Sequence, residues 1–500
     1  MPGNKIICSS ALLCACLAYH AFAPAQNINN SFQIAPLQAP VEVKYEPQVK
    51  PVHIKSFGAI GNGRFNCTQA FQKASAYLQQ YGGTLIIDPG VYIVGRQKFA
   101  NNYFAAGSFF NEPILDIRNA RYPVFILGYK ATLKAADGLK YGSYNPLTGQ
   151  KDSIRKKGNT SDYYASAYTF INAIGCVSFS VKGLTLDGNS GKLAIGPSFG
   201  AEGIQLSATG IVVFNNKKVD ITDCYIHHCA LDAIIVGWPG LKNTDPMYPH
   251  TITNVKAGYN GRQGLSWVGG NNLTVTNSNF SSTGKALNKG VPVVSKPSAG
   301  IDIEIENSII KNGSFINCTV YDNAGPGLST IGHDTYNINF KKVTFIGTTN
   351  SAAYPKSQGL SFDSCTFAGK VERIFGSEDK SKAIAFKNCL FTMDKKLSPG
   401  GKIFAKACEF YEGQNVLFDQ CTFNSDTVRL PVFNYREIVF LNCKFYQHSD
   451  IDFNASASFK GNTQFMMKGK GKVITSEARF EGKILYNNKN VVNLKNPQLE

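Results

Sequence analysis

The sequence predicts an all-β protein in which short parallel strands wind into a solenoid, a parallel β-helix. The composition favours strands and turns over helices, because the 500 residues include 47 Gly, 34 Phe and 23 Tyr but only 5 Met and 2 Trp. A short strand, formed by a small residue followed by Ile or Leu, recurs about every 30 residues, a spacing typical of repeat folds. Six copies begin at Gly203, Ala233, Gly264, Gly300, Gly327 and Gly359.

A second recurring strand carries cysteine. Six cysteines lie two residues before an apolar or aromatic residue, which places both side chains on one face of a strand. We expect these thiols to be free and to stack inside the coils as small buried groups. No Cys-x-x-Cys or Cys/His spacing in the sequence indicates zinc. The six are Cys224, Cys318, Cys365, Cys389, Cys421 and Cys443.

A β-propeller is the alternative repeat fold, but its blades need about 40 residues and four antiparallel strands. Each unit here holds two or three short strands joined by Gly and Asn turns, which favours the β-helix. One helix is expected near the N-terminal end, because Thr68 can cap a helix that runs to about Tyr81. Its apolar face would cover the open end of the first coil. That face comprises Ala70, Phe71, Ala74 and Leu78.

The segment from residue 52 to residue 92 resembles the first coil of the pectate-lyase-superfamily right-handed β-helix proteins. The matching features are Phe57-Gly58-Ala59 with Gly61-Asn62-Gly63, then Gly82-Gly83, then Pro89-Gly90-Val91-Tyr92. Asn66-Cys67 departs from the usual pair of Asp residues. The resemblance implies a right-handed parallel β-helix. It leaves the reaction open, because this superfamily includes lyases, hydrolases, epimerases and phage tailspikes.

The predicted organisation has four parts. Residues 1–25 form a signal peptide, in which Lys5 precedes an apolar run over residues 6–18 and a small-residue cleavage site near Ala25. Residues 26–50 form a linker, residues 51–450 the β-helix, and residues 451–500 the last coils or a C-terminal cap. Residues 13–16 also resemble a lipobox, which would place a lipid on Cys16. We therefore expect an extracytoplasmic protein, periplasmic or secreted, with no transmembrane span after signal removal.

The net charge of +17 favours an anionic partner. An acidic polysaccharide or oligosaccharide fits best, because the sequence carries no nucleic-acid-binding motif. A basic loop over residues 140–157 contains Lys151 and Arg155, which would bind such a chain; a solvated loop is the alternative.

The predicted catalytic residues come from one strand and its neighbours. In the strand from Gly300 to Glu306 the Ile residues alternate, so Asp302 and Glu304 are expected to point outward, about 7 Å apart. Asp232 and Arg262 occupy matching positions on earlier coils. An exposed polar edge or a Ca²⁺ site would explain the same residues.

Two reactions fit this patch. A lyase needs a cation or Ca²⁺ to neutralise a uronate carboxylate and a base, for which Arg262 or a Lys would serve. An inverting hydrolase needs two carboxyl groups about 6.5–9.5 Å apart. The catalytic pattern of the polygalacturonase-type hydrolases is broken here, so their residues are not transferred. A non-catalytic glycan-binding β-helix is the alternative to an enzyme. Predicted substrate-binding residues are Glu202, Gln263, His333, Lys151, Arg155 and Trp238.

Overall fold

A computed structural model provides the coordinates. It describes residues 50–102, 107–153, 163–200, 205–306, 308–332, 334–404, 414–425, 436–447, 451–453, 457–468, 473–475, 478–487 and 489–490. The predicted signal peptide and linker therefore lie outside the described residues, apart from residue 50.

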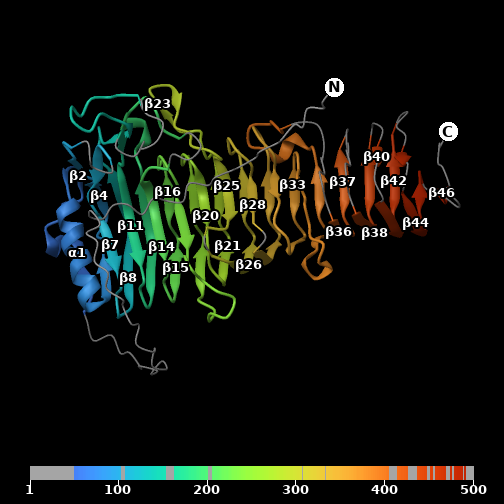
Figure 1. The fold of residues 1–500 in the computed structure, drawn as a ribbon, viewed down its shortest axis with the longest axis horizontal. Helices are drawn as coiled ribbons and strands as arrows, with labels where there is room; N and C mark the ends of the chain where they lie inside the picture. Colours follow the sequence, from blue (N-terminus) through green and yellow to red (C-terminus); the bar gives the residue numbers. More distant parts are fainter. Residues whose placement is uncertain are drawn as a thin grey trace, which may run out of the picture.

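The chain winds into a parallel β-helix whose strands stack along the long axis, with helix α1 (Thr68–Tyr81) at one end (Figure 1). Three parallel stacks of strands form the walls, and the predicted fold class is confirmed. The described part of the chain contains no helix with the length and apolar character needed to cross a bilayer.

The first stack runs the full length of the solenoid, and every neighbouring pair in it is parallel. Its strands are β1 (Val52–His53), β3 (Gly83–Ile86), β8 (Val124–Ala135), β12 (Phe179–Asp187), β15 (Val219–Thr222), β18 (His250–Thr253), β21 (Leu273–Thr276), β26 (Ile310–Ile316), β29 (Thr335–Lys341), β32 (Leu360–Asp363), β34 (Ile384–Lys387), β36 (Gln414–Asp419), β38 (Arg436–Leu441), β41 (Ala457–Gly461) and β44 (Arg479–Gly482).

The second stack follows the first in every coil, and the long strands β8 and β12 belong to both. Its other strands are β2 (Asn62–Asn66), β4 (Gly90–Val94), β16 (Tyr225–His227), β19 (Lys256–Gly258), β22 (Asn279–Ser281), β27 (Thr319–Tyr321), β30 (Thr344–Ile346), β33 (Thr366–Ala368), β35 (Leu390–Thr392), β37 (Thr422–Ser425), β39 (Lys444–Gln447), β42 (Gln464–Met467) and β45 (Leu485–Tyr486).

The third stack closes the coils in the N-terminal two-thirds of the chain. Its strands are β7 (Leu115–Arg118), β11 (Tyr168–Ile174), β14 (Ala208–Phe214), β17 (Ile234–Gly237), β20 (Gln263–Trp267), β25 (Ala299–Glu304), β28 (Leu328–Ile331) and β31 (Ala353–Pro355).

Shorter strands lie outside the three stacks. A lateral sheet contains β5 (Gln97–Phe99), β6 (Phe109–Asn111), β9 (Lys140–Ser143), β10 (Tyr164–Ala165) and β13 (Ala194–Ile195). The strands β23 (Leu287–Asn288) and β24 (Val291–Pro292) form a hairpin, β40 (Ile451–Phe453) pairs with β43 (Val473–Thr475), and β46 (Lys489–Asn490) pairs with β45.

Stacked side chains of one kind hold successive coils together. Phe386 lies between Phe362 and Phe418, with ring centroids 4.8 and 4.9 Å away and rings nearly parallel. These distances match the spacing of neighbouring strands, about 4.8 Å. The six repeat cysteines are buried as predicted. The Cys389 thiol, for example, donates a hydrogen bond to the Phe362 carbonyl of the preceding coil at 3.4 Å.

The turn before three of the six repeat cysteines explains the Asn that stands there. Asn317, Asn388 and Asn442, which precede Cys318, Cys389 and Cys443, all have a φ between 52° and 54°. This left-handed conformation is one that Asn tolerates better than most residues.

Helix α1 has the predicted bounds and buries its predicted apolar face, including Phe71 and Leu78. Its predicted cap is wrong, because Thr68 is the first helical residue and Cys67 takes the capping position. The Thr68 hydroxyl instead donates to Asn66 Oδ1 at 2.7 Å and accepts from the Gly95 backbone N–H at 2.8 Å. It therefore ties the helix to the following coil.

Candidate functional site

A pocket of about 650 Å³ opens on the outer face of the second stack. The three-residue strands there place their middle side chain in the core and the two flanking side chains outside, as Tyr225 and His227 of β16 show around buried Ile226. The pocket is lined by Tyr225, Lys256, Ala257, Gly258, Tyr259, Asn279, Ser281, Ser282 and Tyr321.

Register arranges these side chains in two rows along the solenoid. Tyr225, Lys256 and Asn279 are aligned in one row, and His227, Gly258, Ser281 and Tyr321 are aligned in the other. A Cβ atom at Gly258 would meet only Ser281, at 3.7 Å. The missing side chain at Gly258 therefore leaves open space in the floor of the pocket.

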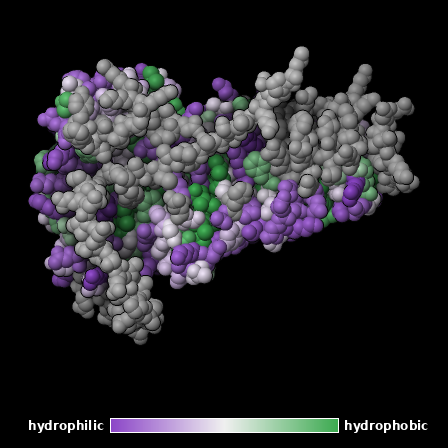
Figure 2. All heavy atoms as spheres, viewed as in Figure 1, coloured by the Kyte–Doolittle hydropathy of each residue, from purple (hydrophilic) through white to green (hydrophobic). Residues whose placement is uncertain are grey.

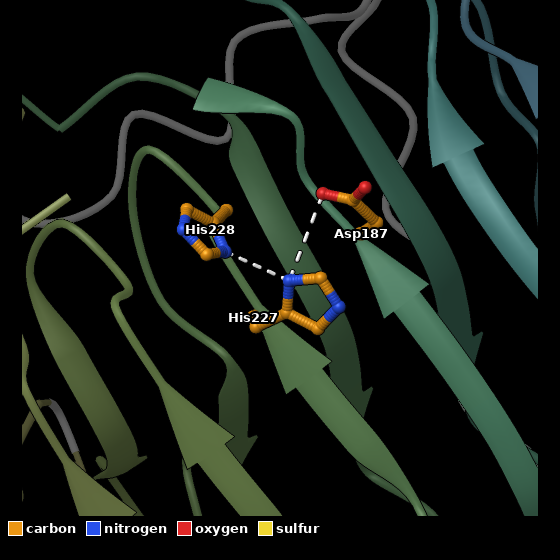
Figure 3. Close-up of side chains that lie close together, drawn as sticks. All are labelled: Asp187, His227 and His228. Atoms are coloured by element: carbon orange, nitrogen blue, oxygen red, sulfur yellow. Dashed lines mark hydrogen bonds and ion pairs between the residues drawn. The ribbon is translucent and has the colours of Figure 1, made fainter. Parts of the chain in front are cut away.

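Three side chains that carry acid–base chemistry meet beside Tyr225 and Tyr259 of this pocket. Figure 3 shows how these three side chains lie. Asp187, the last residue of β12, is in register with His227 on β16, and its Oδ1 lies 3.7 Å from His227 Nδ1. His227 Nδ1 lies 2.8 Å from His228 Nδ1. All three residues are half-buried, and their ligand atoms lie within 4.8 Å of one another. The group offers two imidazole nitrogens and one carboxylate oxygen in one place.

Aromatic rings fix both imidazoles. The Tyr225 ring lies 4.3 Å from the His227 ring, and the Tyr259 ring is stacked on His228 at 5.2 Å and 11°. Burial lowers the pKa of both imidazoles, although the Asp187 carboxylate opposes this shift. The neutral forms are therefore favoured at neutral pH.

One lysine lies beside the cluster, and a second lines the neighbouring pocket. Lys134 Nζ lies 3.4 Å from Asp187 Oδ2. Lys256 is exposed in the pocket and has no ion-pair partner within the described residues. Its ammonium group is free to meet an anion.

The predicted catalytic residues lie elsewhere, on the third stack. Ile301 and Ile303 of β25 are buried in the core, so Asp302 and Glu304 do point outward as expected. Asp302 is nevertheless only 4% exposed, while Glu304 is half-buried. These carboxylates do not form an open groove.

Asp232 and Arg262 bind each other. Both are buried, and Arg262 Nε donates to Asp232 Oδ1 at 2.8 Å while a second guanidinium nitrogen bonds the other carboxylate oxygen. Burial disfavours the charged guanidinium, but the contacts with Asp232 outweigh it and raise the pKa of Arg262. This pairing keeps Arg262 protonated and its guanidinium engaged, which does not suit a proton acceptor.

Gln263 and Asp302 form a second buried polar pair. Gln263 Nε2 donates to Asp302 Oδ2 at 2.6 Å. Burial, with the nearby Glu304 charge, raises the pKa of Asp302 to about 7. Asp302 Oδ1 and Gln263 Oε1 are buried and have no hydrogen-bond partner among the described residues.

The other predicted binding residues are dispersed. Trp238 stacks on Tyr248 at 4.0 Å beyond the end of β17, whereas Asp232 precedes that strand. Lys151 is exposed and pairs with Tyr144 in an isolated antiparallel bridge. Glu202, Arg155 and His333 lie outside the described residues.

The imidazoles of the neighbouring residues His227 and His228 lie on the same side of the chain. Strict alternation along a strand would send the two rings to opposite faces. His228 instead has a φ of 54°, which breaks the alternation and brings its ring to the side of His227. The sequence Tyr225-Ile226-His227-His228 contains the two histidines of the site, but it does not show the left-handed turn at His228.

Comparisons with known proteins support the fold. A family model described as "Right handed beta helix region" matches residues 209–405. Gene product 12 of bacteriophage phi29 is similar over 90% of this chain and 57% of its own length, at 14% identity and a TM-score of 0.51. This chain thus spans less than two-thirds of that relative.

Two further solved structures have lower scores. The A-module of the mannuronan C-5 epimerase AlgE6 from Azotobacter vinelandii has 15% identity and a TM-score of 0.35, covering 87% of this chain and 98% of that one. The tailspike protein gp49 from Pseudomonas phage LKA1 has 13% identity and a TM-score of 0.41, covering 87% and 80%. The comparison with curated protein sequences found no match. The strand topology and the match over residues 209–405 identify the chain as a parallel β-helix protein, right-handed in the matched region.

Proposed function

We propose that this protein binds an acidic polysaccharide outside the cytoplasm and cleaves it in the pocket of the second stack. The observation that carries the proposal is the lining of that pocket, where Tyr225, Tyr259 and Tyr321 lie around the free ammonium group of Lys256. Tyrosine rings give a flat apolar surface with a polar edge, which suits a sugar ring. Lys256 supplies a cation for a sugar carboxylate, and the net charge of +17 would draw the chain toward the protein.

The pocket supports β-elimination as the reaction. This reaction requires a cation to neutralise the uronate carboxylate, an acceptor for the C5 proton and a donor for the leaving oxygen. Lys256 and Tyr225 are aligned on neighbouring strands, and the Asp187–His227–His228 cluster lies beside them. The pocket therefore places a cation, Lys256, and a phenol hydroxyl, Tyr225, along one sugar-sized surface.

Hydrolysis on the third stack is the second candidate, and one observation favours it. The pKa of Asp302 is raised to about 7, which suits a general acid at neutral pH. In this case Asp302 and Glu304 would be the catalytic pair predicted from the sequence.

One assay distinguishes the two candidates. The protein is incubated with polygalacturonate, alginate, hyaluronan and neutral dextran, and both 235 nm absorbance and reducing ends are measured. Absorbance at 235 nm on an acidic glycan, lost in Tyr225→Phe and Lys256→Ala but kept in the exposed-lysine control Lys395→Ala, supports elimination. Reducing ends without this absorbance, lost in Asp302→Asn, support hydrolysis. If no acidic glycan is bound or cleaved, the proposal fails.

A further inference from the structure

We propose that Asp187, His227 and His228 form a binding site for a divalent transition-metal ion, with Zn²⁺ as the best match. The inference starts from the donor set. Two imidazole nitrogens and one carboxylate oxygen are ligands that Zn²⁺ accepts readily, whereas Ca²⁺ and Mg²⁺ prefer oxygen ligands alone. The residues also match a three-ligand site that leaves one position open.

The distances fit a small ion. Ligand atoms about 2.0–2.1 Å from a tetrahedral zinc ion lie about 3.3–3.4 Å from each other. The two observed separations, 2.8 Å between the imidazole Nδ1 atoms and 3.7 Å from His227 Nδ1 to Asp187 Oδ1, lie on either side of this value. The third separation, from His228 to Asp187, is within 4.8 Å. Side-chain shifts of up to about 1.4 Å would therefore bring the three atoms onto one ion.

The surrounding residues hold the three side chains in this arrangement. The Tyr225 and Tyr259 rings pack on the two imidazoles, so neither is free to turn away. The Asn189 backbone N–H donates to Asp187 Oδ1 at 2.9 Å, and Lys134 lies beside Oδ2. Such contacts around the ligands orient them, and their loss usually weakens metal binding by about 10–100-fold.

The open position has a natural occupant. The cluster borders the pocket, since its two imidazoles contact Tyr225 and Tyr259 of the pocket lining. A sugar carboxylate bound there would complete the coordination of the ion. This assignment alone rests on the proposed function; the metal site itself stands on the three side chains.

The experiment measures metal binding without any glycan. The full chain, freed of metal by a chelator, is titrated with Zn²⁺ by calorimetry and with Co²⁺ by visible absorption. We expect one strong equivalent and the intense visible bands of tetrahedral Co²⁺, with no thiolate charge-transfer band. Asp187→Asn, His227→Ala and His228→Ala should each weaken Zn²⁺ binding by at least about 10-fold.

A matched control is present in the chain. His53 Nδ1 lies 2.9 Å from Asp88 Oδ1 in an exposed His–Asp pair. His53→Ala should leave the strong equivalent unchanged. Circular dichroism checks that each variant is folded, and Asp187→Asn, which keeps the side-chain size, carries the test if a histidine variant unfolds.

Two results would overturn the metal site: the absence of a strong equivalent, or binding that persists in all three site variants. Glycan binding is then compared for the metal-free and Zn²⁺-loaded protein. Metal binding without any glycan binding would refute the proposed function and leave the metal site intact. Glycan binding without metal binding would refute the metal site and leave the proposed function intact.

Discussion

Single backbone conformations decide which side chains reach the pocket. The positive φ of His228 adds a second imidazole to the outer face, and the neighbouring coils repeat this turn at Tyr259, Ser282 and Asp322. Gly258 acts in the opposite way, because it removes a side chain from the floor between His227 and Ser281. The pocket is therefore built as much by one missing side chain as by those present.

Filling the floor at Gly258 should block the pocket without unfolding the protein. Gly258 lies in a strand without a positive φ, and a Cβ there meets no atom closer than 3.7 Å. We expect Gly258→Leu to weaken acidic-glycan binding by about 10-fold or more, about 1.4 kcal/mol, while the melting temperature stays near that of the wild type. Gly258→Ala should have a smaller effect. Unchanged binding by Gly258→Leu, measured by calorimetry, would place the glycan elsewhere.

Asp302 should make stability depend on pH. Its pKa is raised to about 7 by burial, above the value near 4 expected in the unfolded chain, so the folded state holds its proton more tightly. The resulting stabilisation is full below about pH 4 and is lost as the pH rises through about 7. In Asp302→Asn the unfolding free energy should fall less steeply between these two pH values. The slope should be smaller by up to about 1.4 kcal/mol per pH unit, which is the value for one proton.

Urea unfolding at several pH values measures this difference. The exposed carboxylate Asp334 provides the control, because Asp334→Asn should retain the wild-type slope. An Asp302→Asn variant with the same pH slope as the wild type would show that Asp302 is ionised in the folded protein at low pH.

At the scale of the elements, the repeat made the fold predictable. Each coil repeats the same inward positions, so Phe, Cys and Ile side chains recur at a spacing that a single sequence displays. The buried polar contacts outside the apolar core were harder to predict. Alternation correctly placed Asp302 outside the core, but it carried no information on what covers the outer face or that Asp232 binds Arg262. Contacts between coils depend on register, which the short repeats leave open.

The phenylalanine stack should make a large contribution to stability. Phe386 is fully buried between two parallel rings, so Phe386→Ala removes the stacking and leaves a cavity. We expect a loss of about 3–5 kcal/mol in the free energy of unfolding. Phe65, which is 49% exposed, is the control, and Phe65→Ala should change stability by less than about 1 kcal/mol. Equal losses in chemical denaturation would contradict a role for the stack.

At the scale of the whole molecule, strands stack along one axis and their outer faces offer a long surface to a polymer (Figure 1). Hydrophilic residues cover much of the described surface that is visible in Figure 2, with smaller hydrophobic areas between them. A solenoid of this kind presents neighbouring coils at nearly constant spacing, which suits a ligand that is itself a repeat.

The net charge should make glycan binding sensitive to salt. With 51 Lys and Arg against 34 Asp and Glu, the protein would attract an acidic chain through charges that are mostly at the surface. Such attraction extends about 10 Å at 0.1 M salt but only about 3 Å at 1 M. We therefore expect the affinity for an acidic polysaccharide to fall by about 10-fold or more over this range, while binding of neutral dextran stays weak throughout. Lys256→Met should lower the affinity and reduce its salt dependence, because the proposed function makes Lys256 the cation that meets the ligand, whereas Lys395→Met should do neither. Calorimetry or polysaccharide pull-down across a salt series measures both quantities. Equal binding of neutral and acidic glycans at every salt concentration would exclude charge as the source of recognition and leave the tyrosine rings as the only recognition surface of the pocket.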